Sequence, residues 1–391
     1  MKIPLIALAM VGLLAPPQED LKTRLVGAYT RAADWLVSQQ GDDGSWKEQG
    51  QSSVAFTGLI VAALAEAPKD LQKKYRPAVD KGLAYITSKQ NDDGSFGEGP
   101  SGAWLKVYTT SISLMAISLA APDKKDAIGN ARGYLKNNQL KEGPDKGGLG
   151  YGDKEPKMEN GKLVEKSAIP NLSTTGFAAE GMARSGLPQD DAFWKLAIEY
   201  VSKCQNNSET NNDPAFLARL KEKNLSVGDD GGLYYAADPS DVKAGRVKIS
   251  DKEIIQSYGS MTYDGIKTYI YAGLRKDDPR VKAAIDWVRK NYSVEAHPGW
   301  AFDDKQRTHL SGLFYYYLMM ARAFDAMGEK TFTTFDGKVH KWANELGEQL
   351  LKVQKDEKMW MNENPRWQEG SPVLVTSFVL NVLNVVTKHV N

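Results

Sequence analysis

The sequence of 391 residues has few of the residues that form cross-links and metal clusters, because it holds one cysteine, Cys204, and four histidines. A lone cysteine excludes an internal disulfide and every zinc or iron–sulfur site that needs several thiolates. An excess of charge is also lacking, since 50 Lys and Arg oppose 49 Asp and Glu and leave a formal net charge of +1. Without a basic field that attracts phosphates, we expect no binding of nucleic acid.

A stretch long enough to cross a membrane is lacking at the N-terminus, where the apolar run covers only residues 3–15. A transmembrane helix needs about 20 apolar residues, so we expect no transmembrane segment there. One lysine precedes the run and two prolines with an acidic stretch follow it, which is the pattern of a secretory signal peptide. We therefore expect a signal peptide over residues 1–15 and an exported protein, periplasmic or secreted; a buried N-terminal helix is the alternative.

Internal repetition is the strongest pattern in the sequence. The segment QQGDDGSW at 39–46 recurs as KQNDDGSF at 89–96, so that Gln40 corresponds to Gln90 and Trp46 to Phe96. These four residues are the candidate structural repeat motif. An aromatic residue precedes the glutamine, or the residue equivalent to it, by five positions in five copies, at Trp35, Tyr85, Tyr134, Tyr200 and Trp287. Such self-similarity is typical of repeat architectures.

Each repeat unit reads as a helix, a glycine-rich loop and a second helix. The first helix is amphipathic and the second is nearly apolar all round, which predicts an outer layer with one wet face and an enclosed inner layer. The second segments lie at 56–65, 108–120, 174–183, 263–274, 310–321 and 375–385. We therefore predict an all-α fold, an α/α toroid of six helical hairpins in two concentric layers.

We expect a single toroid domain over residues 21–391, and we expect it to be a monomer. Two loop insertions, at 152–171 and 206–256, lie between a first helix and its second helix. Loops longer than about 15 residues in a compact domain are commonly functional or disordered, so these two are candidates for a lid or a partner surface.

The repeat resembles the QW repeat of squalene-hopene and oxidosqualene cyclases, and the helix pairs are similar to those of protein prenyltransferase β subunits. The resemblance runs from about Leu21 to Val386 and implies the terpenoid cyclase type of α/α toroid. The repeated residues are structural in such proteins. The resemblance therefore implies how the ring is held together and leaves the activity open.

The catalytic motifs of three toroid families are missing. Class II cyclases carry D-x-D-D-T-A, whereas the corresponding stretch here, residues 260–265, reads SMTYDG. Prenyltransferases hold zinc with a D-x-C pattern, but Ser202 stands two positions before Cys204. Thioester domains need a glutamine three residues after the cysteine, where this chain has Asn207. We expect no metal and no cofactor.

Asp264 and His309 are the two candidate catalytic residues. Alignment of YDGIKTY with FTGLIVA places Asp264 where other repeats have Thr or Ser. Asp264 is then either a helix cap, which costs about 1 kcal/mol to remove, or a buried acid whose loss abolishes turnover. His309, or a tyrosine, would be the partner of that acid. Asp303 and Asp304 precede His309, but a solvated loop is the favoured interpretation of that group.

The starts of the second helices carry hydroxyl side chains. N-capping is the favoured role for these residues, and an anion-binding rim is the alternative. The residues are Thr57, Thr109, Thr175, Ser311 and Thr376.

Aromatic and polar side chains of the second helices are candidates for a ligand-binding cavity, although core packing is an open alternative. They are Thr262, Tyr263, Tyr269, Tyr108, Tyr315 and Tyr316. The leading hypothesis is a toroid protein that binds an apolar, isoprenoid-like small molecule or a protein partner at the cavity rim. The alternative is a divergent enzyme that uses Asp264, either a class II cyclase-like isomerase or a polysaccharide lyase or glycosidase.

Overall fold

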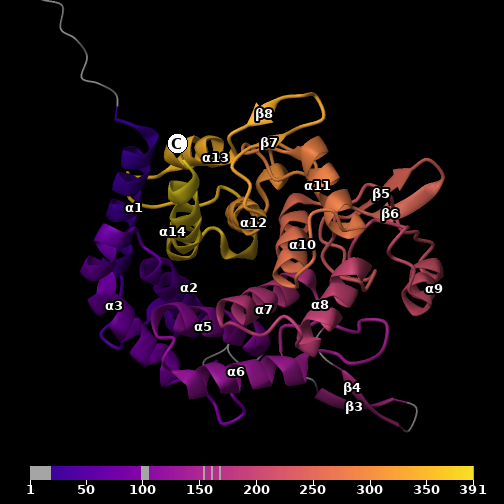
Figure 1. Cartoon of the computed structure of the whole chain (residues 1–391), viewed down its shortest axis with the longest axis horizontal. Helices are drawn as coiled ribbons and strands as arrows, with labels where there is room; N and C mark the ends of the chain where they lie inside the picture. The colour runs from indigo at the N-terminus through magenta and orange to yellow at the C-terminus, as the bar shows by residue number, and fades with distance from the viewer. Residues whose placement is uncertain (1–18, 98–104, 153–154, 160–161, 167–168, 391) are drawn as a thin grey trace, which may run out of the picture.

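Twelve helices of the described residues form two concentric layers, as Figure 1 shows. The computed structural model describes residues 19–97, 105–152, 155–159, 162–166 and 169–390, with only the backbone of 155–159 and 162–166. The expected signal peptide at 1–15 lies outside the described residues. The outer helices are α1 (Leu21–Ser38), α3 (Lys69–Thr87), α6 (Lys125–Asn138), α8 (Ala192–Lys203), α11 (Pro279–Asn291) and α13 (Trp342–Val353). The inner helices are α2 (Val54–Ala65), α5 (Lys106–Ala120), α7 (Leu172–Arg184), α10 (Gly259–Tyr271), α12 (Leu313–Met327) and α14 (Pro372–His389).

The inner helices form a closed ring. Each one contacts the next along the chain, and α14 contacts α2, so that the last hairpin closes on the first. α1 also packs against α13 and α14. The predicted α/α toroid of six hairpins is therefore confirmed.

Burial follows the two sequence patterns that predicted the layers. α3 buries Tyr75, Val79, Leu83 and Ile86, which recur every three or four residues and leave the opposite face in water. In α2, by contrast, every residue from Phe56 to Leu64 is buried. A helix that is apolar all round has no face for solvent, so it takes the inner layer.

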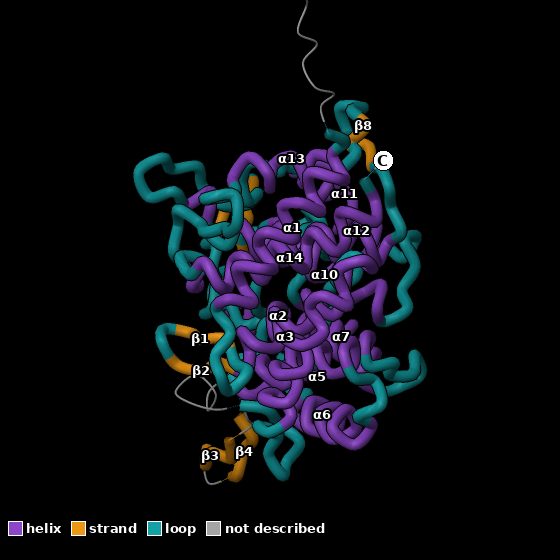
Figure 2. Tube along the Cα trace, turned by 90° about the vertical axis from the view of Figure 1, so that its left-hand side faces the viewer, coloured by secondary structure: helices purple, strands orange, loops and turns teal. Residues whose placement is uncertain are grey.

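Within the described residues, four antiparallel two-stranded hairpins occupy loops between helices, and the sequence did not indicate them as strands. They are β1 (Trp46–Glu48) with β2 (Gln51–Ser53), β3 (Glu155–Glu159) with β4 (Lys162–Lys166), β5 (Arg246–Ile249) with β6 (Lys252–Ile255), and β7 (Phe332–Thr333) with β8 (Val339–His340). Figure 2 shows β1–β2 and β3–β4 on the same side of the ring. The first insertion holds β3–β4, and the second holds α9 (Pro214–Glu222) and β5–β6. No helix among the described residues combines the length and apolarity needed to cross a membrane.

The repeated glutamines join each loop to the following outer helix. The side-chain amide of Gln40 donates to the carbonyl of Gly44 in its own loop and to that of Ala78 in α3, at 2.9 and 3.0 Å. Three other glutamines make the same pair of bonds, to a loop glycine and to the next outer helix: Gln90, Gln139 and Gln205. One amide therefore satisfies two carbonyls and sets the distance between successive units.

The repeated aromatic residues secure the loop to the outer helix that precedes it. The indole N–H of Trp46 donates to the carbonyl of Leu36, and that of Trp360 donates to Leu350. Both indole rings are fully buried. Phe96 takes the same place without an indole donor, and it is also fully buried.

The hydroxyls expected as N-caps have a different role. Thr57 lies one turn inside α2 and accepts from the backbone N–H of Trp46 at 3.0 Å, while its own hydroxyl donates to the carbonyl of Ser53. We call this contact between a loop N–H and a first-turn threonine the hydroxyl clamp. It recurs at Thr110, Thr175, Thr262 and Thr376.

The N-cap prediction was therefore wrong for these residues. Thr110, not Thr109, forms the second clamp, and Ser311 lies before α12, which begins after Gly312. The caps are the side chains of Ser53, Asn171 and Ser371, which accept from backbone N–H groups of α2, α7 and α14.

Replacing Thr57 by valine tests the hydroxyl clamp. The variant keeps the shape of the side chain but leaves the buried N–H of Trp46 without an acceptor, so we expect a loss of about 1–3 kcal/mol in the free energy of unfolding. Thr87→Val is the matched control, because the Thr87 hydroxyl bonds only carbonyls of its own helix. Urea unfolding of both variants makes the measurement, and equal losses would contradict the clamp.

Candidate functional site

A cavity of about 260 Å³ lies at the centre of the ring, where the inner helices begin. All six inner helices contribute to its wall within their first two turns. The contributors include Phe56, Ile112, Ser173, Met261, Tyr315 and Phe378. Five more aromatic residues line it: Tyr108, Tyr151, Tyr235, Tyr258 and Trp367. The wall is thus mainly apolar and aromatic, with a few polar groups.

Asp264 lies beneath this cavity and does not line it. Its side chain is fully buried, and its Oδ2 accepts a hydrogen bond from the hydroxyl of Tyr315 at 3.2 Å. Its Oδ1 lies 2.9 Å from Nζ of Lys267. The carboxylate packs on the backbone of α7 at Gly176, where a Cβ atom would lie 2.1 Å from Oδ1. A side chain at position 176 would therefore displace the carboxylate of Asp264.

The alignment that placed Asp264 at a hydroxyl position was wrong by two residues. Thr262 forms the fourth hydroxyl clamp, with the N–H of Leu233 at 3.0 Å. Asp264 stands two residues further along α10. The corresponding positions of the other clamps are Leu59, Ile112, Phe177 and Phe378. Asp264 is therefore a carboxylate in an apolar layer, and it is not a helix cap.

A second layer, with polar side chains at three of its five positions, lies five residues after each clamp. It comprises Ala62, Met115, Glu180, Lys267 and Asn381. Within it, Oε2 of Glu180 lies 3.2 Å from Nζ of Lys267 and 2.8 Å from Nη1 of Arg322, which comes from α12. Arg322 also donates to Oδ1 of Asn381 at 3.3 Å. The negative charges of Asp264 and Glu180 are therefore balanced by the positive charges of Lys267 and Arg322 inside the ring.

The pKa of Asp264 is raised and that of Glu180 is lowered, because the two carboxyls have different charged neighbours. Burial raises the pKa of Asp264, and Lys267 offsets that rise only in part. Burial acts in the same direction on Glu180, but Arg322 and Lys267 together outweigh it and hold the pKa of Glu180 below its ordinary value. Removing one member of such a buried pair costs about 3–5 kcal/mol, more than the loss of a cap. Loss of stability on truncation of Asp264 would thus not show whether Asp264 is a catalytic acid or a structural residue.

Glu369 is a third buried carboxyl, and unlike Asp264 and Glu180 it lines the cavity. Its side chain is 1% exposed. Its Oε1 accepts from the backbone N–H of Tyr315 at 2.7 Å, and its Oε2 accepts from that of Phe314 at 3.3 Å and from the side-chain amide of Asn362. Burial outweighs these donors and raises the pKa of Glu369 to about 7. The carboxyl thus caps α12 from the following repeat unit.

The two residues before Glu369 have left-handed backbone conformations, with φ of 55° at Trp367 and 64° at Gln368. Such conformations cost of order 1 kcal/mol or more in a residue with a side chain. The side-chain amide of Gln368 donates to Oε1 of Glu48 at 2.7 Å, which joins the last unit to the first. The Trp367 ring packs edge-on to Trp300 at 5.5 Å between centroids. These contacts hold the loop over the cavity.

His297 lines the cavity in a fixed, neutral form. Its Nε2 accepts from the backbone N–H of Ser260 at 2.8 Å, so its Nδ1 carries the proton and donates to the carbonyl of Ser311 at 2.6 Å. Burial lowers the pKa of His297 to about 3. With both ring nitrogens engaged, His297 joins α10 to the loop before α12.

His309, the other candidate catalytic residue, does not line the cavity. Its ring stacks on Phe302, with centroids 4.1 Å apart, in the short helix η1 (Thr308–Leu310). Among the described residues, no contact joins it to Asp264. The structure thus gives Asp264 a different polar neighbour at the cavity wall, Tyr315.

The six candidate ligand-binding residues divide into two groups. Tyr108 and Tyr315 line the cavity. The other four do not: Thr262 forms a hydroxyl clamp, Tyr263 packs on Phe324, Tyr269 donates to Gln205 and Tyr316 donates to the carbonyl of Ser293. These four lie between the two helical layers, so their expected place in the cavity was wrong.

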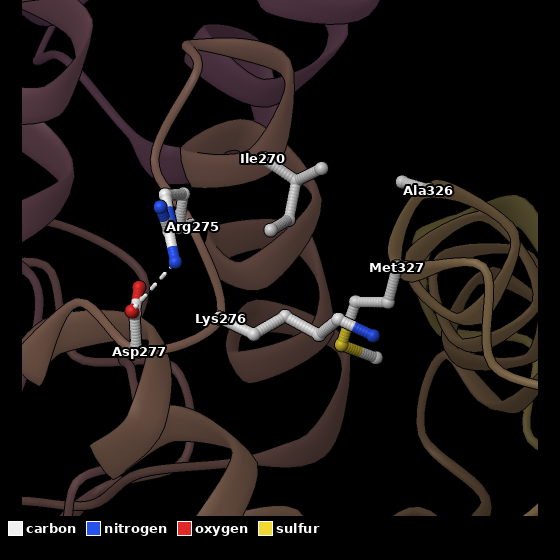
Figure 3. Close-up of a pocket in the computed structure, with 6 residues that line it drawn as sticks. All are labelled: Ile270, Arg275, Lys276, Asp277, Ala326 and Met327. Atoms are coloured by element: carbon white, nitrogen blue, oxygen red, sulfur yellow. Dashed lines mark hydrogen bonds and ion pairs between the residues drawn. The ribbon is translucent and has the colours of Figure 1, made fainter.

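A second, more open pocket lies at the other ends of α10 and α12 (Figure 3). It is lined by Ile270, Arg275, Lys276, Asp277, Ala326 and Met327. Arg275 pairs with Asp277 at 3.0 Å, and Lys276 pairs with Glu329. Its cations are thus already neutralised by neighbours. No group of three or more His, Cys, Asp or Glu in the described part of the chain is placed to hold a metal ion.

No protein-family model and no curated protein matches this chain. Solved structures do match. A type II terpene cyclase from Scytonema, MstE, in complex with geranylgeranyl dihydroxybenzoate is 12% identical, with 94% of this chain and 99% of that chain covered and a TM-score of 0.53. A family 76 glycoside hydrolase, a mannosidase from Bacteroides thetaiotaomicron, is 11% identical over 94% and 98%, with a TM-score of 0.56. A D-mannose isomerase is 12% identical over 96% and 100%, with a TM-score of 0.55. These neighbours share the α/α toroid fold with this chain.

The pH dependence of stability tests the environment of Glu369. A carboxyl whose pKa is higher in the folded state binds its proton more tightly there, so its contribution to stability is complete below about pH 4.5 and is lost as the pH rises through about 7. The loss is of order 3 kcal/mol. We expect the difference in free energy of unfolding between the wild type and Glu369→Gln to fall by about that amount from pH 4.5 to 7.5.

Carboxyls with lowered pKa values, such as Asp93 and Asp191, give the opposite slope, but they are common to both proteins and cancel in the difference. Denaturant unfolding at a series of pH values makes the measurement. A difference that is flat or rises with pH would contradict the raised pKa of Glu369.

Proposed function

We propose that the chain binds a small, mainly apolar molecule in the central cavity. The observation that carries this proposal is the cavity of about 260 Å³ with a wall built from all six inner helices. Ligand sites are typically apolar concavities with a few polar groups that fix orientation, and this cavity fits that description. Its volume is near the lower end of the range for such sites, about 300 Å³.

The lining favours an isoprenoid-like ligand over a sugar. Leu59, Ile112, Met261 and Leu374 supply aliphatic surface beside the aromatic rings. A sugar needs many hydrogen-bond partners, because each buried hydroxyl without one costs free energy. One structural neighbour, MstE, is described in complex with a geranylgeranyl compound, which supports the proposal by analogy of fold alone.

A cavity-filling substitution tests the binding site. Ala55 lines the cavity and is half-buried, so Ala55→Phe places a ring in the ligand space. We expect isothermal titration calorimetry to show geraniol binding to the wild type and at least about tenfold weaker binding to the variant. Ala84→Phe on the exposed face of α3 is the matched control and leaves affinity unchanged. Equal affinity in all three proteins, or no binding to any, would contradict the proposal.

An enzyme that transfers a proton to its ligand is the second candidate function. The Tyr315 hydroxyl lies between Oδ2 of Asp264, at 3.2 Å, and Oγ of Ser173, at 3.1 Å, and it belongs to the cavity wall. In this reaction Asp264 starts in its protonated form, and Tyr315 gives its proton to an alkene carbon of the ligand while it takes the proton of Asp264. The carbocation that forms then loses a proton from a neighbouring carbon, which returns through Tyr315 to the Asp264 carboxylate, so that an isomeric alkene leaves and both residues are restored. Asp264 would be a positioning and proton-supplying residue, since Tyr315 is the group that meets the ligand.

Deuterium incorporation tests proton transfer. If the second function holds, geraniol incubated with the protein in D2O gains deuterium at carbon, and Tyr315→Phe lowers the rate by about 100-fold or more. Tyr316→Phe is the matched control, because Tyr316 is a buried neighbour that does not line the cavity. Mass spectrometry measures the incorporation. No incorporation, or equal rates in both variants, would leave binding as the function.

A further inference from the structure

The charged residues of the cavity wall are of one sign. Glu48 and Glu369 line the cavity, and the described lining contains no lysine or arginine. His297 adds no charge, because its Nε2 accepts a hydrogen bond and the ring is neutral. The remaining ionisable groups of the wall are tyrosines.

Glu369 already uses the helix N-terminus that an anionic ligand would need. The backbone N–H groups of Phe314 and Tyr315 at the start of α12 donate to its carboxyl. With the amide of Asn362, these donors fill three of the roughly four acceptor positions of a carboxylate. The backbone N–H of Leu313 also approaches this carboxyl, so what Glu369 offers a ligand is its negative charge. The anion-binding rim that the sequence allowed is thus not supported at α12.

The charges near Glu369 do not supply a cation to the cavity. On its own loop, Glu363 pairs with Arg307, and Arg366 is exposed and lies over the rings of Trp300 and Trp367. Of these two rings, that of Trp367 lines the cavity, and the Arg366 guanidinium lies outside the lining. Below the cavity, Lys267 faces Asp264 and Glu180, and Arg322 faces Glu180. From β1, Glu48 adds a second carboxylate.

Aromatic rings surround the same space. A cation over the face of an aromatic ring is attracted by the ring quadrupole, and the attraction grows when water is excluded. The rings are those of Phe56, Tyr108, Tyr151, Tyr235, Tyr258, Tyr315, Trp367 and Phe378. A carboxylate among aromatic rings favours an ammonium group, whereas a second carboxylate or a phosphate would meet repulsion.

We propose that the ligand of the cavity is a protonated amine with an apolar body, and that Glu369 binds its ammonium group. This inference rests on the proposed binding function and adds the chemical class of the ligand. Glu369 is buried, held by three donors and placed at the wall by a loop with two left-handed residues. The apolar body would fill the space between the inner helices.

Three probes with one apolar body and different head groups test this inference: cyclohexylmethylamine, cyclohexylmethanol and cyclohexanecarboxylate. We expect calorimetry at pH 8 to show that the amine binds the wild type at least about tenfold more tightly than the alcohol, and that the carboxylate binds least. In Glu369→Gln the amine loses this advantage while the alcohol keeps its affinity. Glu363→Gln, in the same loop but outside the cavity, is the matched control and keeps the preference for the amine.

The pH profile adds a readout that packing alone would not change. Burial raises the pKa of Glu369 to about 7, so the affinity for the amine rises between pH 6 and pH 8 in the wild type and stays flat in Glu369→Gln. An alcohol or carboxylate that binds as tightly as the amine would overturn the inference. A preference for the amine that survives in Glu369→Gln would overturn the assignment to Glu369. If no probe binds, and geraniol does not bind either, the proposed binding function itself fails.

Discussion

The hydrogen bond from a loop N–H group to a threonine one turn inside an inner helix fixes where that helix begins, and the cavity depends on those beginnings. Thr57 holds the loop at Trp46 in this way, and four other threonines repeat the contact. The glutamine amides connect neighbouring repeat units, because each donates to a carbonyl of its own loop and to one of the next outer helix. The clamps fix where five of the inner helices begin, Glu369 caps the sixth, α12, and the glutamines set the distance between units. The central cavity is the space enclosed by the first turns of the six inner helices.

The interior then carries more charge than a structural core needs. Asp264, Lys267, Glu180 and Arg322 are almost completely buried, and each finds an opposite charge within 3.2 Å. A well-packed apolar layer would often be as stable as a buried ion network, so stability alone does not explain these residues. Above this layer, the charged side chains of the described cavity wall are the carboxyls of Glu48 and Glu369. The ring thus separates a balanced charged layer from a negative, aromatic pocket.

The sequence was sufficient for the fold because the repeat records the two layers directly, in half-wet helices such as α3 and enclosed helices such as α2. It was less sufficient for the site. The sequence alignment matched Tyr263, Asp264 and Gly265 with residues 56–58, and so placed Asp264 at the position of Thr57. The hydroxyl clamp at Thr262 shows that this alignment is shifted by two residues. Glu369 and His297 lie in loops without local periodicity, and their partners are 54 and 37 positions away in the sequence. A carboxyl that caps the helix of the preceding unit has no signature in its own segment.

The closure of the ring joins the two ends of the described chain. Arg24 of α1 forms a two-pronged pair with Glu348 of α13, and the amides of Asn381 and Asn384 on α14 donate to carbonyls of α2. During synthesis, the apolar surface of the first hairpin that faces the last hairpin therefore stays uncovered until the last hairpin is made. Contacts so distant in sequence slow folding, because the chain must close a loop of more than 300 residues before they form. Until the final hairpin leaves the ribosome, the nascent chain is an open arc with two unpaired ends, the state in which such a protein depends most on chaperones.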